Sequence, residues 1–142
     1  MTHGHIDVRP PLLVLLLPVR LEAFPAREPV ERLLVAPGVL AVDPPRMPLS
    51  VALAAAVARR QVKRMRLPGI PRAVAVFGTV QVPLAAALIE RHPEAELWSL
   101  AGPEPQADFT FDVGGAADLR PAWERMERLG IESGRLGSER LG

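Results

Sequence analysis

The residue types that most often carry catalysis are scarce in this sequence of 142 residues. It contains no cysteine, which excludes thiolate catalysis, disulfides and cysteine-ligated zinc or iron–sulfur sites. Two of its three histidines, His3 and His5, lie in a polar amino-terminal segment, and the sequence has no phosphate-binding glycine loop, serine-nucleophile motif, zinc-protease motif or calcium loop. We therefore predict no metal site and no cofactor, and we identify no catalytic residue.

The third histidine, His92, precedes Pro93 at the end of an apolar helical pattern. The carboxyl-terminal end of a helix carries a partial negative charge, which favours the protonated imidazole. We expect His92 to be a charged structural residue that ends the helix rather than a catalytic base.

Residues that could bind a substrate follow three short apolar runs. Loops at the carboxyl ends of parallel strands are where open α/β sheets bind ligands. The candidates in such loops are Arg20, Glu22, Asp43, Gly78 and Thr79. Asp43 could hold a sugar or ribose hydroxyl, or it could begin a turn with Pro44 and Pro45. The segment that contains Arg20 and Glu22 could likewise line a cleft or be a solvated connection.

The elements that must position these residues are clearest over residues 72–100. Residues 73–77 are a continuous apolar run, typical of a parallel strand buried on both faces, so we expect Val74 and Val76 in the core. A helix between Pro83 and Pro93 follows, and residues 97–100 form a second strand. A crossover of this length joins parallel strands, which indicates a βαβ unit.

The same alternation of strand and helix patterns extends over most of the chain. We predict strands over residues 12–17, 39–42, 73–77 and 97–100, with residues 109–111 as a candidate fifth. Further helices are predicted over residues 28–36, 50–66 and 117–130. Together these elements predict one Rossmann-like α/β domain over residues 1–130, with three layers and a mostly parallel sheet of four to five strands. Residues 131–142 are predicted to form a flexible tail.

The helix predicted over residues 50–66 has an apolar stripe that includes Val51, and a basic opposite side. That side carries Arg59, Arg60, Lys63, Arg64 and Arg66. It could meet an acidic partner, anionic lipid or nucleic acid, or it could be a solvated face near the helix end. Nucleic acid is disfavoured because aromatic side chains for base stacking are missing nearby.

The apolar run at residues 12–17 is far shorter than the roughly 20 residues of a membrane-spanning helix. It also resembles the core of a signal peptide, but Arg20 and Glu22 follow closely and no small-residue cleavage site appears. We expect this run to be a buried first strand, and the protein to be cytoplasmic and not transmembrane.

Two stretches, LLLPVRLEAF at residues 15–24 and AVAVFGTVQVPLAAALIERHPEAELWSL at residues 73–100, resemble the amino-terminal lobe of GT-B glycosyltransferases. In that family the amino-terminal lobe is Rossmann-like and receives the sugar acceptor, whereas a second lobe binds the nucleotide-sugar. The resemblance implies that the loop after Val19 and the turn at Gly78 and Thr79 face the cleft. The family's diphosphate-binding residues have no counterpart here, so we expect no sugar transfer without a donor-binding lobe.

A second interpretation belongs to a different class of function. The chain would be a small non-catalytic α/β module that binds an acidic partner through the basic helix, or a nucleotide at the edge of the sheet.

Overall fold

The computed structural model describes residues 9–23, 30–46, 50–77, 82–100, 106–111 and 120–133. Five parallel strands form one sheet in the order β2-β1-β3-β4-β5. The strands are β1 (Pro11–Leu16), β2 (Val39–Val42), β3 (Ile70–Val76), β4 (Glu96–Ser99) and β5 (Phe109–Thr110). The helices are the short 3-10 turn η2 (Leu21–Ala23), α1 (Val30–Leu34), α2 (Val51–Arg64), α3 (Val82–Arg91) and α4 (Arg120–Arg128). The predicted α/β fold and its parallel sheet are confirmed.

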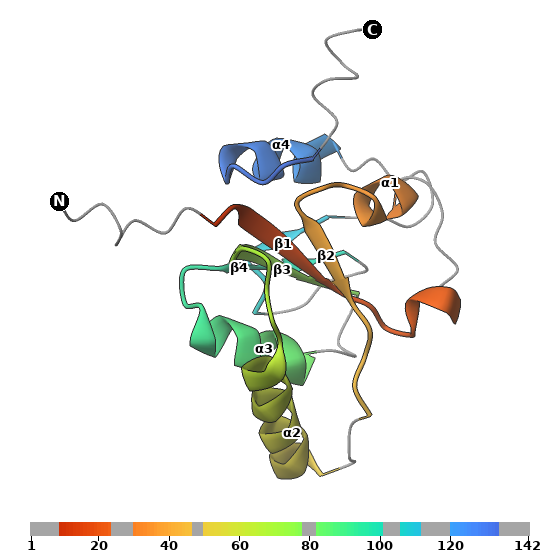
Figure 1. Cartoon of the computed structure of the whole chain (residues 1–142), viewed down its shortest axis with the longest axis vertical. Coiled ribbons are helices and arrows are strands. Elements are labelled where there is room, and N and C mark those ends of the chain that lie inside the picture. Colours follow the sequence, from red (N-terminus) through yellow and green to blue (C-terminus); the bar gives the residue numbers. More distant parts are fainter. Residues whose placement is uncertain are drawn as a thin grey trace, which may run out of the picture.

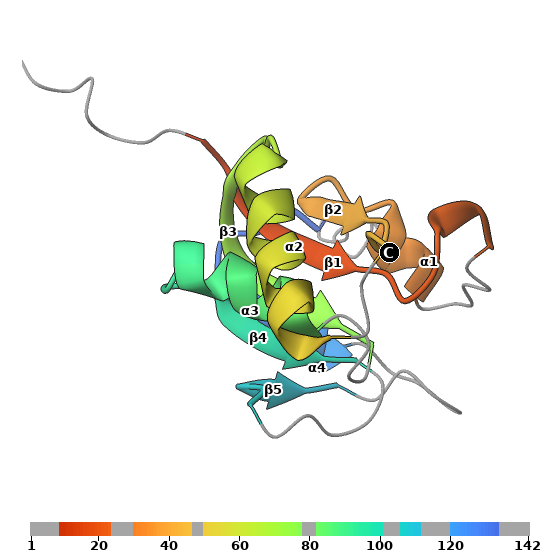
Figure 2. The ribbon, with the colours of Figure 1, turned by 90° about the horizontal axis from the view of Figure 1, so that it is seen from below.

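Helices cover both faces of the sheet, α1 and α4 on one face and α2 and α3 on the other (Figure 1). Alternate residues of β1 explain the two layers, because successive side chains of a strand point to opposite faces. Leu13 and Leu15 belong to the core under α1 and α4, whereas Val14 and Leu16 belong to the core under α2 and α3. The view from below shows α2 and α3 side by side across the strands (Figure 2).

The strand order follows from a single change of direction at β1. The chain moves outward from β1 to β2, then crosses back to place β3 on the other side of β1. In sheets of this order, ligands bind at the switch point between β1 and β3, outside the carboxyl ends of the strands. The loops after β1 and β3 are the two that carry most of the predicted binding residues.

Strand β3 begins at Ile70, three residues earlier than predicted, because the chain meets β1 there. The Ile70 amide donates to the carbonyl of Pro10 at 2.8 Å, and a Cβ on Gly69 would lie 2.1 Å from that carbonyl oxygen. Pro71 is tolerated inside the strand because the β1–β3 register shifts between Leu12 and Leu13. The predicted core residues are confirmed, since Val74 and Val76 are fully buried.

Helix α2 begins where Ser50 caps it, with Ser50 Oγ accepting from the Leu53 amide at 3.4 Å. It ends at Arg64, two residues before the predicted end, because Met65 has an extended backbone. The prediction that Val51 lies on the buried stripe is wrong, because Val51 is 86% exposed. The first turn of α2 stands away from the sheet, which leaves Val51 in solvent (Figure 1).

Helix α4 ends at Arg128, and Gly130 follows it with a φ of 77°, which glycine adopts easily. The Gly130 amide donates to the carbonyl of Glu127 and the Ile131 amide to that of Met126, which together form a Schellman motif. The next residue, Glu132, accepts a 2.7 Å hydrogen bond from the Gly38 amide just before β2. Of the predicted tail, residues 131–133 are therefore placed against the domain, and residues 134–142 lie outside the described residues.

Candidate functional site

Three of the five predicted binding residues lie together at the carboxyl ends of β1 and β2. Asp43 Oδ1 accepts a 2.8 Å hydrogen bond from the amide of Leu21, which lies between Arg20 and Glu22 in the turn η2. Arg20 Nε is 3.4 Å from Glu22 Oε1, and both side chains are more than two-thirds exposed. Asp43 thus fastens the loop after β1 to the loop after β2.

The chemistry of this cluster is limited by its exposure. An ion pair between two solvated side chains, such as Arg20 and Glu22, contributes only about 0–1 kcal/mol to stability. Asp43 fastens the backbone of the neighbouring loop, and the turn with Pro44 and Pro45 that the sequence offered as an alternative is not formed over residues 43–46. Gly78 and Thr79, predicted to form the β3 side of the cleft, lie outside the described residues.

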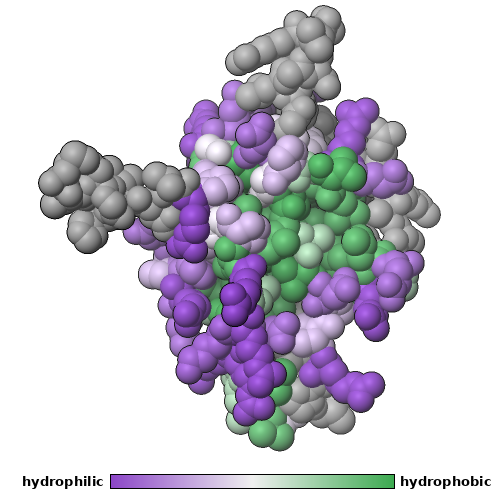
Figure 3. All heavy atoms as spheres, viewed as in Figure 1, coloured by the Kyte–Doolittle hydropathy of each residue, from purple (hydrophilic) through white to green (hydrophobic). Residues whose placement is uncertain are grey.

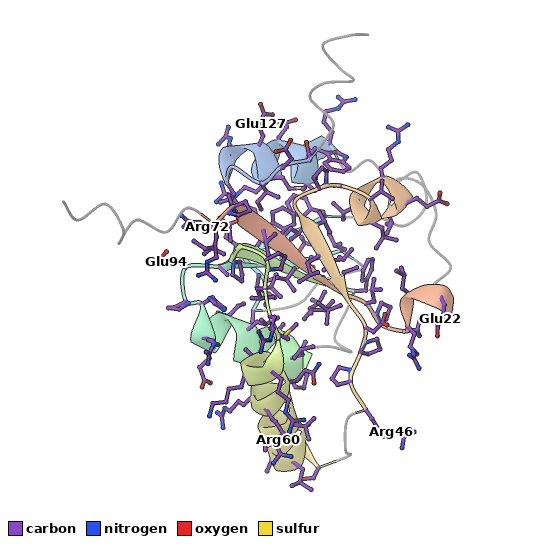
Figure 4. All side chains as sticks on the ribbon, viewed as in Figure 1. Glu22, Arg46, Arg60, Arg72, Glu94 and Glu127 are labelled. Atoms are coloured by element: carbon purple, nitrogen blue, oxygen red, sulfur yellow. The ribbon has the colours of Figure 1, made fainter. Side chains whose placement is uncertain are left out.

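A second candidate site is a groove of about 580 Å³ between α2 and α3. Its floor contains the buried side chains of Val62 and Ala87, which hold the two helices together on the same face of the sheet. Its rim consists of charged side chains from both helices: Arg59, Arg60, Lys63, Glu90 and Arg91. Figure 4 shows Arg60 on α2 well apart from Glu22 in η2, so the groove and the first cluster are separate.

The described residues that line the groove make it strongly basic, with four cations against one carboxylate. Arg59 Nη2 lies 3.5 Å from Glu90 Oε2, and both side chains are about two-thirds exposed. Among the described residues, no ion pair involves Arg60, Lys63 or Arg91. Because these three cations surround an apolar floor, the groove is suited to an anionic ligand that also has apolar atoms.

The sequence predicted the α2 side of this groove but not the α3 side. The basic side of α2 follows from helical periodicity, but the contribution of Glu90 and Arg91 depends on how α3 packs beside α2. Periodicity within one helix does not reveal which helix lies next to it. The chain order strand, helix, strand, helix, strand offers the one available signal, because right-handed crossovers over the same face place α2 and α3 side by side.

The expectation that His92 is protonated at the end of α3 is wrong. Burial lowers the pKa of His92 below its ordinary value, and the positive charges of Arg91 and Arg9 lower it further. Burial and these two charges outweigh the favourable effect of the helix end on the protonated imidazole. The His92 backbone amide donates to the carbonyl of Leu88 at 2.8 Å, which continues the helical hydrogen bonding by one residue past Arg91.

One polar cluster was missed by the sequence analysis. Glu96, at the start of β4, accepts hydrogen bonds from Arg125 Nε at 2.9 Å, from Arg125 Nη2 and from Trp98 Nε1 at 3.1 Å. Arg125 also lies over the ring of Phe109, 4.6 Å from its centroid. The cluster joins β4, β5 and α4, and we interpret it as structural because its charged groups are partly buried and satisfied by one another.

The pKa of Glu96 reflects this arrangement. Burial alone would raise the pKa, but the hydrogen bonds from Arg125 and Trp98 and the charge of Arg125 together bring it below its ordinary value. Glu96 is therefore ionised throughout the neutral range.

The described residues contain no group of three metal-ligating side chains from histidine, cysteine, aspartate or glutamate. None of the described helices is long and apolar enough to cross a membrane. Comparison with protein-family models, curated proteins and solved structures finds no match. The resemblance to a GT-B lobe thus stays a prediction.

Proposed function

We propose that the protein is a non-catalytic α/β binding module whose groove between α2 and α3 holds an acidic segment of a partner protein. The observation that supports this function is the position of Arg60, Lys63 and Arg91 around an apolar floor, with Glu90 as the one acid on the rim. Carboxylates along a peptide would pair with the cations, while an apolar side chain would cover Val62 and Ala87.

The direction of the two helices favours a peptide over a nucleotide. Phosphate groups bind best at helix amino termini, where backbone N–H groups point outward. The groove instead lies along the last two turns of both α2 and α3, which end at Arg64 and Arg91. The carbonyl ends of these helices present no outward N–H groups to a phosphate, and no described aromatic side chain lines the groove to stack a base. Carboxylates spread along a chain match the spaced cations better.

Fluorescence anisotropy with a labelled glutamate-rich peptide tests this function directly. Arg60→Ala and Arg91→Ala remove one cation from each side of the groove, and each is expected to weaken binding about three- to tenfold. Arg64→Ala is the matched control, because it removes the same charge from the same helix but Arg64 does not line the groove. Because the rim cations are exposed, added salt is expected to weaken binding further.

Two results would contradict the proposal. If Arg64→Ala weakened binding as much as Arg60→Ala, the attraction would be a property of the whole helix and not of the groove. If inorganic pyrophosphate or ATP bound more tightly than the peptide, the ligand would be a nucleotide or another phosphate compound.

A second candidate function is the acceptor-binding side of a glycosyltransferase. It is supported by the cluster of Arg20, Glu22 and Asp43, because these side chains bring one cation and two carboxylates to the carboxyl ends of adjacent strands. Carboxylate and guanidinium groups are suitable hydrogen-bond partners for sugar hydroxyls. The chain alone is expected to bind a saccharide without transferring sugar to it.

Saturation-transfer NMR with a saccharide panel tests this second function. Arg20→Ala should abolish the transfer signal, while Arg46→Ala, which changes an exposed arginine outside the cluster, should leave it unchanged. Turnover of a nucleotide-sugar by the purified chain would contradict the proposed need for a donor-binding lobe. If no saccharide in the panel gave a saturation-transfer signal, the acceptor role would be contradicted.

A further inference from the structure

Among the strands that the structure describes, β2 forms one edge of the sheet and pairs with β1 alone. Its four residues, VLAV, are all half-buried and uncharged. Natural sheets protect their edges with charges, prolines or very short strands, because an open edge pairs readily with another chain. The opposite edge is protected in this way, since β5 has only two residues.

The backbone of β2 has a pairing position directed away from the sheet. The carbonyls of Gly38 and Val42 accept hydrogen bonds from the amides of Leu13 and Leu17. The backbone N–H and C=O groups of the even-numbered residues in β2 therefore face β1. In a parallel pair the alternate residues then face outward. The Val39 amide donates to the carbonyl of Ala36, which leaves Ala41 with both its N–H and its C=O facing outward.

The surface around this edge is apolar and electrically balanced. Figure 3, which looks onto the β2 edge, shows a hydrophobic area over β2 and toward α1. Val35, in the turn between α1 and β2, is 81% exposed. The neighbouring helix α1 carries one acid and one base, Glu31 and Arg32, so two copies that meet here would not repel each other. The basic groove lies on α2 and α3, away from this edge.

We propose that β2 is a self-association edge, on which β2 of a second copy of this chain pairs antiparallel to form one continuous ten-stranded sheet from two five-stranded ones. Two-fold symmetry requires the antiparallel direction for identical strands. With Ala41 at the centre, the two Ala41 residues exchange both hydrogen bonds, and Leu40 of each copy faces Val42 of the other. The assembly closes at the dimer, because the remaining outer edges are the short β5 strands.

A second copy fits this edge better than an unrelated strand does. The pairing surface is short and uncharged, so it offers no charge pattern that would select a different partner. Antiparallel pairing about Ala41 sets Leu40 of each copy against Val42 of the other, so both cross-strand pairs are apolar. The exposed Val35, in the turn just before the strand, adds apolar surface at each end of the pair.

Light scattering after size exclusion, over a series of protein concentrations, measures the expected dimer of the 15.4 kDa chain. Val35→Glu introduces a charge at the edge without touching the core, and it should raise the dimer dissociation constant at least about tenfold. Val51→Glu is the matched control, because Val51 is equally exposed on the far end of α2, and it should leave the dimer intact. Ala41→Pro removes the central N–H and should give a folded monomer, with folding checked by circular dichroism.

Several outcomes would overturn the proposal. A wild-type chain that stays monomeric over the whole concentration series has no such edge pairing. A dimer that resists both Val35→Glu and Ala41→Pro, or one that Val51→Glu also dissociates, uses a different surface. Higher oligomers would show that the pairing does not close.

Discussion

Glu96 is the residue whose environment most clearly affects stability. It is partly buried and holds Arg125 and Trp98 through hydrogen bonds, so Glu96→Gln would leave the Arg125 guanidinium without its carboxylate. We expect a loss of about 1–3 kcal/mol in the free energy of unfolding, measured by urea denaturation. Glu94→Gln is the control, because Glu94 faces Arg72 at 3.5 Å on the open surface (Figure 4) and should change stability by less than about 1 kcal/mol. Equal losses in the two variants would contradict the structural role of Glu96.

The lowered pKa values of His92 and Glu96 predict that stability falls as the solution becomes acidic. For His92 the unfolded chain binds the proton more readily, so stability is lost as pH falls through the ordinary value of 6.5. For Glu96 the stabilising contribution is present above its ordinary pKa of 4.5 and is lost as pH falls through the lower folded value. Thermal melts over a pH series should show both losses, and His92→Gln should remove only the one nearer neutral pH. A melting temperature that rises on acidification from neutral pH would contradict this sign.

At the scale of the elements, the sequence predicted the strands β1, β2 and β3 well because they contain short continuous apolar runs. The bounds that differ do so for tertiary reasons. Strand β3 starts early because Gly69 allows the chain to approach Pro10, and the first turn of α2 exposes Val51 because it stands away from the sheet. The Arg125–Glu96 pair joins residues 29 positions apart, and no local pattern indicates such a pair. Of the predicted site, three residues are placed together, and Gly78 and Thr79 lie outside the described residues.

The approach of β3 to β1 gives a prediction for glycine at two positions. Gly69→Ala places a Cβ 2.1 Å from the backbone oxygen of Pro10, so the strands must move apart at a cost of about 1–3 kcal/mol. Gly130→Ala has room, with its nearest neighbour Pro11 at 3.4 Å, but it forces alanine to a φ of 77° at a cost of about 1–2 kcal/mol. Urea denaturation should therefore find Gly69→Ala the less stable of the two. The reverse order would indicate that the contact at Gly69 relaxes easily.

At the scale of the whole molecule, charge and apolar surface are separated. The basic groove lies on α2 and α3, and the uncharged apolar edge lies at β2. A module with this division can bind an acidic ligand and a second copy of itself at the same time. Neither surface blocks the other, because the groove belongs to the face of the sheet and the pairing position belongs to its edge.

The two surfaces together predict avidity. A dimer joined through β2 carries two basic grooves, so a layer of closely spaced acidic peptides can hold both at once, and the second contact becomes intramolecular. We expect the wild-type chain to dissociate from a dense glutamate-peptide layer at least about tenfold more slowly than Val35→Glu, and the two to behave alike on a sparse layer. Surface plasmon resonance at two peptide densities measures this difference.

Equal dissociation rates on the dense layer, from a chain that light scattering shows to be dimeric, would mean that the two grooves cannot reach one surface together. Loss of binding at both densities in Arg60→Ala but not in Arg64→Ala would assign the contact to the groove itself.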